Sequence, residues 1–168
     1  IVNPNLHNDI FPSKCIAGVG VIFYVLLALR TALRESGWFE QKKITEPNMG
    51  QFLDLVALGT VADVVKLDKN NRIFVEQGLR RIRSGQCCAG ISALLKIGKR
   101  NQSNIVASDL GFAIGPRLNA AGRLDDMSLG IECLLADDMQ KALRLATTLD
   151  EMNSERRLIE QDMKEQAL

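Results

Sequence analysis

The chain has 168 residues, of which 46% are hydrophobic and 24% charged, and its formal net charge is +1 at pH 7. This balance is typical of soluble globular proteins and argues against a disordered chain or a uniformly basic nucleic-acid binder. The longest apolar run, residues 18–29, is too short to cross a bilayer, so we expect no membrane partner. The chain begins without an initiator methionine or a secretory signal, which predicts an internal fragment.

The first third of the chain predicts a loop and two helices. Residues 1–14 contain Asn-Pro and Phe-Pro steps and are predicted to form a loop. Apolar helix formers predict a mostly buried helix over residues 16–35, and a second helix is expected from Pro47-Asn48 to Gly59. The β-branched stretch that follows fits either a helix continuation or one short strand near residues 60–66, and we expect the strand.

Short helices are expected through the middle of the chain. Either Asn70 or Asn71 is a suitable N-cap for a helix that ends at Ser84-Gly85. Residues 90–97 form a further helical candidate.

Two more short helices are predicted over residues 108–115 and 128–135. The first has Ser108 as its expected N-cap, and its Phe112 and Ile114 look buried.

The longest predicted element runs from about Asp138 to the end of the chain and contains neither Gly nor Pro. A helix of roughly thirty residues is long for a globular domain, so we expect a connector that leads out of the domain.

Basic side chains concentrate in the region 72–100, where Glu76 is the only acid. Such a region could contact phosphate, or it could be an ordinary solvated helix face. Its seven cations are Arg72, Arg80, Arg81, Arg83, Lys96, Lys99 and Arg100. The four cysteines have no CxxC spacing, so reduced thiols in a cytoplasmic protein are expected rather than a zinc site.

Three acids lie in "LDLVALGTVADVVKLD", namely Asp54, Asp63 and Asp68. Asp63 follows small and apolar residues, where a carboxylate needs a cation or hydrogen-bond donors if it is buried. It is either an oxygen ligand for Mg²⁺ or Mn²⁺, or a helix cap or salt-bridge partner. His7 is the only histidine and no DxD motif is present, so the chain cannot assemble a two-metal centre unaided.

The stretch "GFAIGPRLNAAGRLDDMS" places Arg117, Asn119 and Arg123 among glycines and alanines. Guanidinium groups can hold phosphate in a bidentate manner, and small neighbours allow close approach. The alternative is that Arg117 or Arg123 pairs with Asp125 or Asp126, and composition does not separate the two interpretations.

Several long motifs together resemble one known family, the single-strand-specific DNA exonucleases of the DHH phosphoesterase superfamily. They are "LDLVALGTVADVV", "NNRIFVEQGLRRIRSG", "GFAIGPRLNAAGRLDDMS" and "LDEMNSERRLIEQDM". The resemblance implies a metal-dependent hydrolase that removes nucleotides from the 5′ end of single-stranded DNA in repair and recombination. It also implies two Mn²⁺ or Mg²⁺ ions, with a helicase and a single-strand-binding protein as partners.

The resemblance further implies the fold and the organisation of the chain. We expect a mostly α fragment: residues 1–136 would be the C-terminal part of an α/β DHH catalytic domain, and residues 137–168 a long connecting helix towards a DHH-associated domain. The family's DxD and DHH motifs would lie upstream and its GGH motif downstream, which leaves the metal site incomplete here. Lys66 stands where the family pattern has proline.

The same resemblance implies roles for four residues. Asp63 in "ALGTVAD" matches a catalytic metal ligand, and Arg117, Asn119 and Arg123 in "GPRLNAAGR" match contacts to DNA phosphates. The fragment alone is expected to be inactive. Two alternatives stay open: a DHH phosphoesterase that acts on short oligonucleotides or cyclic dinucleotides, and a non-catalytic helical module that binds nucleic acid.

Overall fold

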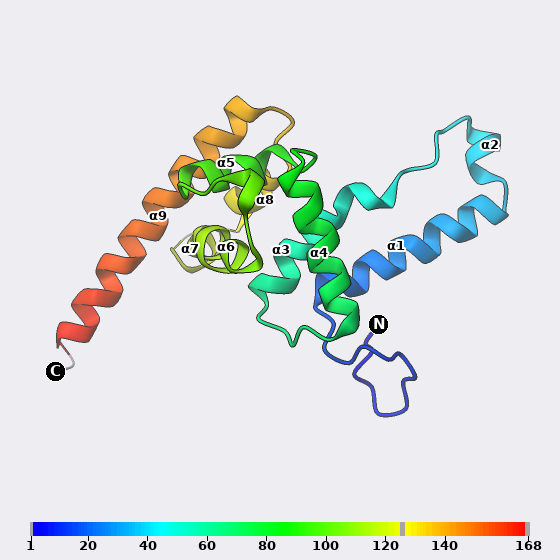
Figure 1. Cartoon of the computed structure of the whole chain (residues 1–168), viewed down its shortest axis with the longest axis horizontal. Coiled ribbons are helices and arrows are strands. Elements are labelled where there is room, and N and C mark those ends of the chain that lie inside the picture. The colour runs from blue at the N-terminus through cyan, green and yellow to red at the C-terminus, as the bar shows by residue number, and fades with distance from the viewer. Residues whose placement is uncertain (1, 125–126, 167–168) are drawn as a thin grey trace. The chain divides into compact units, whose positions relative to one another are not determined.

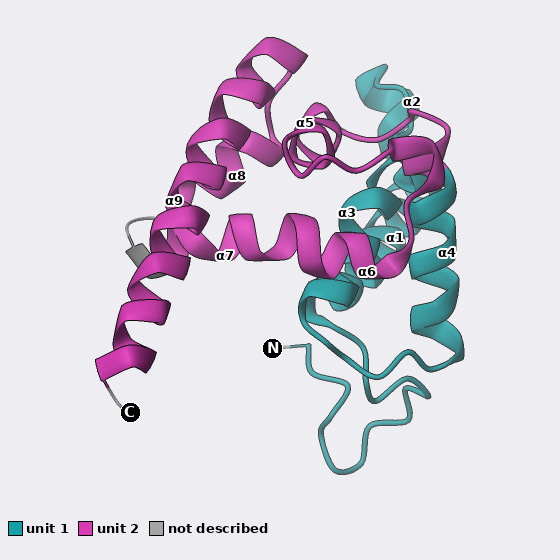
Figure 2. Ribbon diagram, turned by 60° about the vertical axis from the view of Figure 1, so that its left-hand side comes forward, with its two compact units in different colours: residues 1–80 teal, residues 81–168 magenta. Residues whose placement is uncertain are grey.

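The computed structural model describes residues 2–124 and 127–166, apart from the side chains of Arg123 and Leu124. Throughout these residues the regular secondary structure is helical, and no strand forms (Figure 1). The chain divides into two compact units, residues 1–80 and 81–168, coloured separately in Figure 2. None of the described helices is both long enough and apolar enough to cross a membrane.

The first unit contains α1 (Gly18–Glu35), α2 (Trp38–Lys42), the 3₁₀ turn η1 (Met49–Phe52), α3 (Leu53–Ala62) and most of α4 (Lys69–Arg83). Its core is an apolar cluster from α1, η1, α3 and α4 and the segment before α1. The cluster comprises Ile16, Phe23, Met49, Val56 and Phe74. The Phe23 and Phe74 rings meet edge to face, with centroids 5.5 Å apart.

The helix predicted over residues 16–35 is confirmed as α1, but it is not mostly buried. Only Gly20 and Phe23 of α1 are fully buried, whereas Ile22 and Leu29 are each 51% exposed. Apolar composition over the whole stretch therefore overstated the burial of this helix.

The strand expected near residues 60–66 is wrong, because α3 continues through Gly59 to Ala62. A Cβ at Gly59 would lie 2.8 Å from Cγ1 of Val19, so this glycine permits close packing of α1 rather than ending α3. The hydroxyl of Thr60 donates to the Val56 carbonyl at 2.7 Å, which keeps its polar group satisfied inside the helix.

The second unit contains α5 (Ala89–Ile97), η2 (Gln102–Asn104), α6 (Ala107–Asp109), the π-helical η3 (Leu110–Ile114), α7 (Gly115–Leu124), α8 (Ser128–Leu134) and α9 (Met139–Gln166). The α6, η3 and α7 segments follow one another without a break. A Cβ at Gly90 of α5 would lie 2.2 Å from the Cys133 carbonyl oxygen of α8, so these helices pack with their backbones almost touching.

Two predicted N-caps are wrong. The helix predicted from residue 108 begins at Ala107, and the carboxylate of Asp109, not Ser108, accepts a hydrogen bond from the Val106 N–H at 3.0 Å. At α4 the cap is Asp68 rather than Asn70 or Asn71, since its carboxylate accepts from the Asn71 N–H at 2.9 Å.

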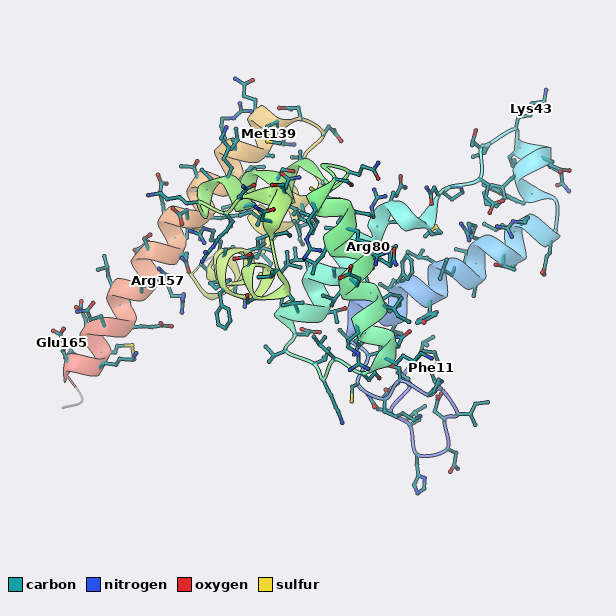
Figure 3. All side chains as sticks on the ribbon, viewed as in Figure 1. Phe11, Lys43, Arg80, Met139, Arg157 and Glu165 are labelled. Atoms are coloured by element: carbon teal, nitrogen blue, oxygen red, sulfur yellow. The ribbon has the colours of Figure 1, made fainter. Side chains whose placement is uncertain are left out.

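The long C-terminal helix is confirmed as α9, which the side chain of Asp138 caps by accepting from the Lys141 N–H at 2.7 Å. The first half of α9 packs on α5, α7 and α8 through small or apolar residues, which include Ala142, Ala146 and Leu149. Its second half is largely exposed, and Arg157 and Glu165 project from it in Figure 3. The proposed connector, residues 137–168, thus includes a half that packs in the second unit.

Candidate functional site

Asp63 lies immediately after α3, where the helix gives way to a turn. Its backbone N–H donates to the Gly59 carbonyl at 3.0 Å, which fixes the main chain as the last turn of the helix. The residue is exposed, and no hydrogen bond or ion pair within the described residues engages its carboxylate. Its oxygens are therefore available as ligands for a hard cation, unlike those of a buried salt-bridge partner.

The next residue, Val64, has a strained backbone. Its φ is +54°, the left-handed region that β-branched residues rarely adopt. Its N–H donates to the Val61 carbonyl at 3.1 Å, and its side chain is 88% exposed. A conformation that usually belongs to glycine after a helix is here adopted by valine, directly beside the candidate ligand.

Asp68 anchors the segment that leads from this turn into α4. Its carboxylate accepts from the Asn71 N–H at 2.9 Å and from the Ser13 hydroxyl at 2.7 Å. The Asn71 N–H, followed by the Ser13 hydroxyl, holds the pKa of Asp68 below its usual value. Asp68 is therefore a structural carboxylate that joins the α4 N-terminus to the opening loop.

The side chain of Asn71 makes a second connection across the same segment. Its amide N–H groups donate to the carbonyls of Cys15 at 2.9 Å and Lys66 at 2.8 Å, and the residue is fully buried. The loop after Asp63 is thus tied both to α4 and to the N-terminal segment. Such anchoring limits the freedom of the turn that presents Asp63.

The third acid of this stretch, Asp54, lies in the first turn of α3 and is only 1% exposed. Its Oδ1 accepts from the Leu55 N–H at 2.8 Å. Asp54 therefore faces the interior, and Asp63 is the acid of the three that is exposed at a strained turn.

The helix that carries "GPRLNAAGR" has one buried side, formed by Leu110, Ala113, Ile114, Ala120 and Ala121. Asn119 is exposed. The side chain of Arg123 and both residues of its alternative partner pair, Asp125 and Asp126, lie outside the described residues.

Arg117 is held by groups of the second unit. Its Nη2 lies 2.7 Å from Oδ1 of Asp150 on α9, and its Nη1 donates to the Ala113 carbonyl at 2.5 Å. Its side chain is 13% exposed. The arginine therefore braces α7 against α9, through an acid 33 residues away that the sequence analysis did not consider.

Asp63 belongs to the first compact unit, whereas Arg117, Asn119 and Arg123 belong to the second. The surroundings of Asp63 are therefore described within the first unit, and those of Arg117 and Asn119 within the second.

The basic region is mostly engaged in local contacts. Arg81 and Arg83 donate to the carbonyls of Gln86 and Ile105 at 2.7 and 2.9 Å. The ion pairs are Arg80 with Glu76 at 2.8 Å and Arg100 with Asp109 at 3.3 Å. The ordinary structural interpretation therefore accounts for four of the seven cations.

The remaining metal-binding side chains do not cluster. Among residues 2–124 and 127–166, no group of three or more His, Cys, Asp or Glu could hold an ion. Cys15 and Cys133 are free thiols, and burial raises the pKa of the Cys133 thiol to about 11. A metal held by Asp63 would need further ligands beyond this described set.

The predicted burial of Phe112 is wrong, because its side chain is 75% exposed. The signal was present in the spacing. Phe112 stands two residues from both Leu110 and Ile114, and a step of two residues turns a helix by about 200°, onto the opposite side.

Comparisons with known proteins agree with the motifs. No family model matches the chain. The single-stranded-DNA-specific exonuclease RecJ of Dickeya dadantii is 60% identical and that of Escherichia coli 59% identical, each over all 168 residues. The chain spans 29% of the length of each of these relatives.

Solved structures give the same result. The crystal structure of exonuclease RecJ bound to manganese matches 95% of this chain and 37% of that protein, with a TM-score of 0.75 and 32% identity. RecJ from Thermus thermophilus in complex with Mg²⁺ matches 74% of this chain and 19% of that protein, with a TM-score of 0.63 and 33% identity. The resemblance inferred from the motifs is thereby confirmed, and all 168 residues match a segment of the RecJ single-stranded-DNA-specific exonucleases.

Proposed function

We propose that the chain is part of a metal-dependent exonuclease that hydrolyses phosphodiester bonds of single-stranded DNA from the 5′ end. The observation that carries the proposal is the exposed carboxylate of Asp63 at a strained and anchored turn. The names of the relatives supply the substrate class, and solved relatives that contain Mn²⁺ or Mg²⁺ supply the metal class.

In this proposal Asp63 supplies one ligand of a two-ion site whose other ligands come from outside the described residues. When bound, the ions would activate water and stabilise the charge that develops on the phosphate. The chain's own contribution is to hold the carboxylate. Asn71 fixes the turn by donating its N–H to the Asp68 carboxylate and its side-chain amide to the Lys66 carbonyl, so the ligand is oriented before metal binds.

The second unit would position the DNA strand through Arg117, Asn119 and Arg123. Exposure supports a direct contact by Asn119. For Arg117 the bonds to Asp150 and Ala113 favour a bracing role, with phosphate contact through whatever edge of the guanidinium stays accessible. Assignment of Arg123 to a phosphate rests on the motif alone.

The biological setting follows the same family likeness: a cytoplasmic enzyme of DNA repair and recombination, working with a helicase and a single-strand-binding protein. We propose that this fragment is inactive by itself, because one carboxylate cannot hold two ions.

The test is an exonuclease assay with Mn²⁺ on the full-length protein that contains this chain, using single-stranded and duplex DNA labelled at the 5′ end. We expect loss of the 5′ nucleotide from single strands only, and a fall in rate of at least about 100-fold in Asp63→Ala, as for loss of a group that acts on the transition state. Asp162→Ala, which removes an exposed acid from the far half of α9, is the matched control and should keep wild-type activity.

Two results would contradict the proposal. Activity in Asp63→Ala equal to that of the control would remove Asp63 from the metal site. Salt-dependent DNA binding without any hydrolysis would favour the binding-module alternative, while turnover of cyclic dinucleotides but not of long strands would favour the other phosphoesterase class.

A further inference from the structure

Phe112 is unusual among the aromatic residues of the described chain. The other rings mostly pack on one another: Phe11 on Tyr24, Tyr24 and Phe23 on Phe74, and Trp38 on Phe39. Phe52 is 37% exposed, whereas Phe112 is 75% exposed. Phe112 is the most exposed aromatic ring among the described residues, so its π face is accessible to a ligand.

The position of Phe112 follows from its place on a firmly packed element. Leu110, Ala113 and Ile114 of η3 are buried at 0–3% exposure and hold the segment on the second unit. Phe112 therefore lies on the outer side of a fixed helix and does not belong to a mobile loop. A rigid platform loses little conformational freedom when a planar ligand stacks on it.

The outer side of this helix also carries the phosphate-binding candidate. Phe112, the half-buried Pro116 and the exposed Asn119 recur at intervals of four and three residues, the spacing of one helix face. Seven residues of helix span about 10 Å along the axis. One strand can therefore place a base against the ring and a phosphate beside the amide.

We propose that Phe112 is a stacking platform for an unpaired nucleobase, so that the helix of residues 107–124 binds single-stranded DNA through both a base and its backbone. The inference deepens the proposed function and rests on it. A single strand is the fitting occupant because its bases are exposed, whereas the bases of a duplex are stacked on one another. Stacking on an aromatic ring tolerates any base, since each has a flat π face.

The proposal is tested in the full-length protein by DNA-binding titrations in EDTA, which prevent hydrolysis. Phe112→Ala should weaken binding of single strands roughly 5- to 150-fold, the range that corresponds to one lost base–aromatic stack. Phe112→Leu, which keeps apolar bulk without a π face, should lose nearly as much, whereas Phe112→Trp should bind as well as wild type or better. Thermal melting of each variant checks that the fold is kept.

A scan of single abasic sites along the oligonucleotide distinguishes base stacking from a role of Phe112 in packing, because only stacking makes the affinity depend on the base at one position. One abasic position should weaken wild-type binding and leave Phe112→Leu unchanged, because the stack is already missing there. Two results would overturn the inference. One is equal binding by wild type and Phe112→Leu. The other is a scan in which the abasic site and Phe112→Leu weaken binding additively at every position. If wild type degrades single strands and Phe112→Ala does so equally well, only this inference fails; if wild type neither binds nor degrades them, the proposed function fails with it.

Discussion

Replacing Val64 with glycine should stabilise the protein and keep the turn beside Asp63. A left-handed backbone costs a non-glycine residue about 1–2 kcal/mol, and Val64 has φ +54°. Glycine removes that cost but adds about 0.5–1 kcal/mol through the extra freedom of the unfolded chain. Since the Val64 side chain is 88% exposed, little burial is lost. The expected gain in the free energy of unfolding is about 0.5–1 kcal/mol.

Urea denaturation of wild type, Val64→Gly and Val64→Ala measures this balance. Alanine keeps a Cβ and thus retains most of the strain, so it serves as the matched control and should not gain stability. A gain of about 1 kcal/mol would raise the Tm by about 2–4 °C in a chain of this size. Exonuclease activity of the full-length protein should stay near the wild-type level in Val64→Gly, because glycine adopts the left-handed backbone without strain and the Asn71 hydrogen bonds still hold the turn beside Asp63. Destabilisation by glycine equal to or greater than that by alanine would refute the assignment of strain to this residue.

Two further predictions concern polar contacts inside each unit: the Asp68 hydrogen bonds in the first and the Arg117–Asp150 ion pair in the second. The pKa of Asp68 is lowered in the folded protein, so its charged form contributes stability above the unfolded pKa near 4 and loses that contribution as pH falls through the folded pKa. Asp68→Ala should cost about 1 kcal/mol at neutral pH as a lost N-cap, and urea denaturation should show its deficit shrinking below about pH 4; a deficit unchanged down to about pH 2 would contradict the role of the charge. For Arg117 and Asp150, a double-mutant cycle of Arg117→Gln and Asp150→Asn should give a coupling energy of about 1 kcal/mol that falls in high salt, since Asp150 is 36% exposed. Additivity within about 0.3 kcal/mol would mean that the pair does not brace α7 against α9.

Local sequence patterns predicted most helices and the family, but they did not reveal the partners of side chains. The helix over residues 16–35, the one that ends at Gly85 and the long C-terminal helix follow from spacing and from cap residues, and all three are present as α1, α4 and α9. Local sequence predicts a helix end at Gly59 because glycine is common there, whereas the structure shows that Gly59 allows the close approach of Val19, a feature of tertiary packing.

In the candidate site, too, local sequence identified residues but not their side-chain partners. The motif around Asp63 identified the acid, yet nothing local shows that Asp68 would bond Ser13 from the opening loop, a contact 55 residues apart in sequence. Arg117 was expected to pair with a nearby acid or with substrate, but its partner Asp150 comes from the next long helix. Phe112, in contrast, could have been placed correctly from the helical period, since its neighbours at two residues on either side are the buried ones.

The central claim, that Asp63 is a metal ligand, is tested most directly by titrating Mn²⁺ into the full-length protein in a calorimeter. Wild type and the Asp162→Ala control should bind two ions, and Asp63→Ala should lose one of them or bind with at least about tenfold lower affinity, because a carboxylate ligand to a hard cation has been removed. Binding of two ions by Asp63→Ala with wild-type affinity would contradict the account.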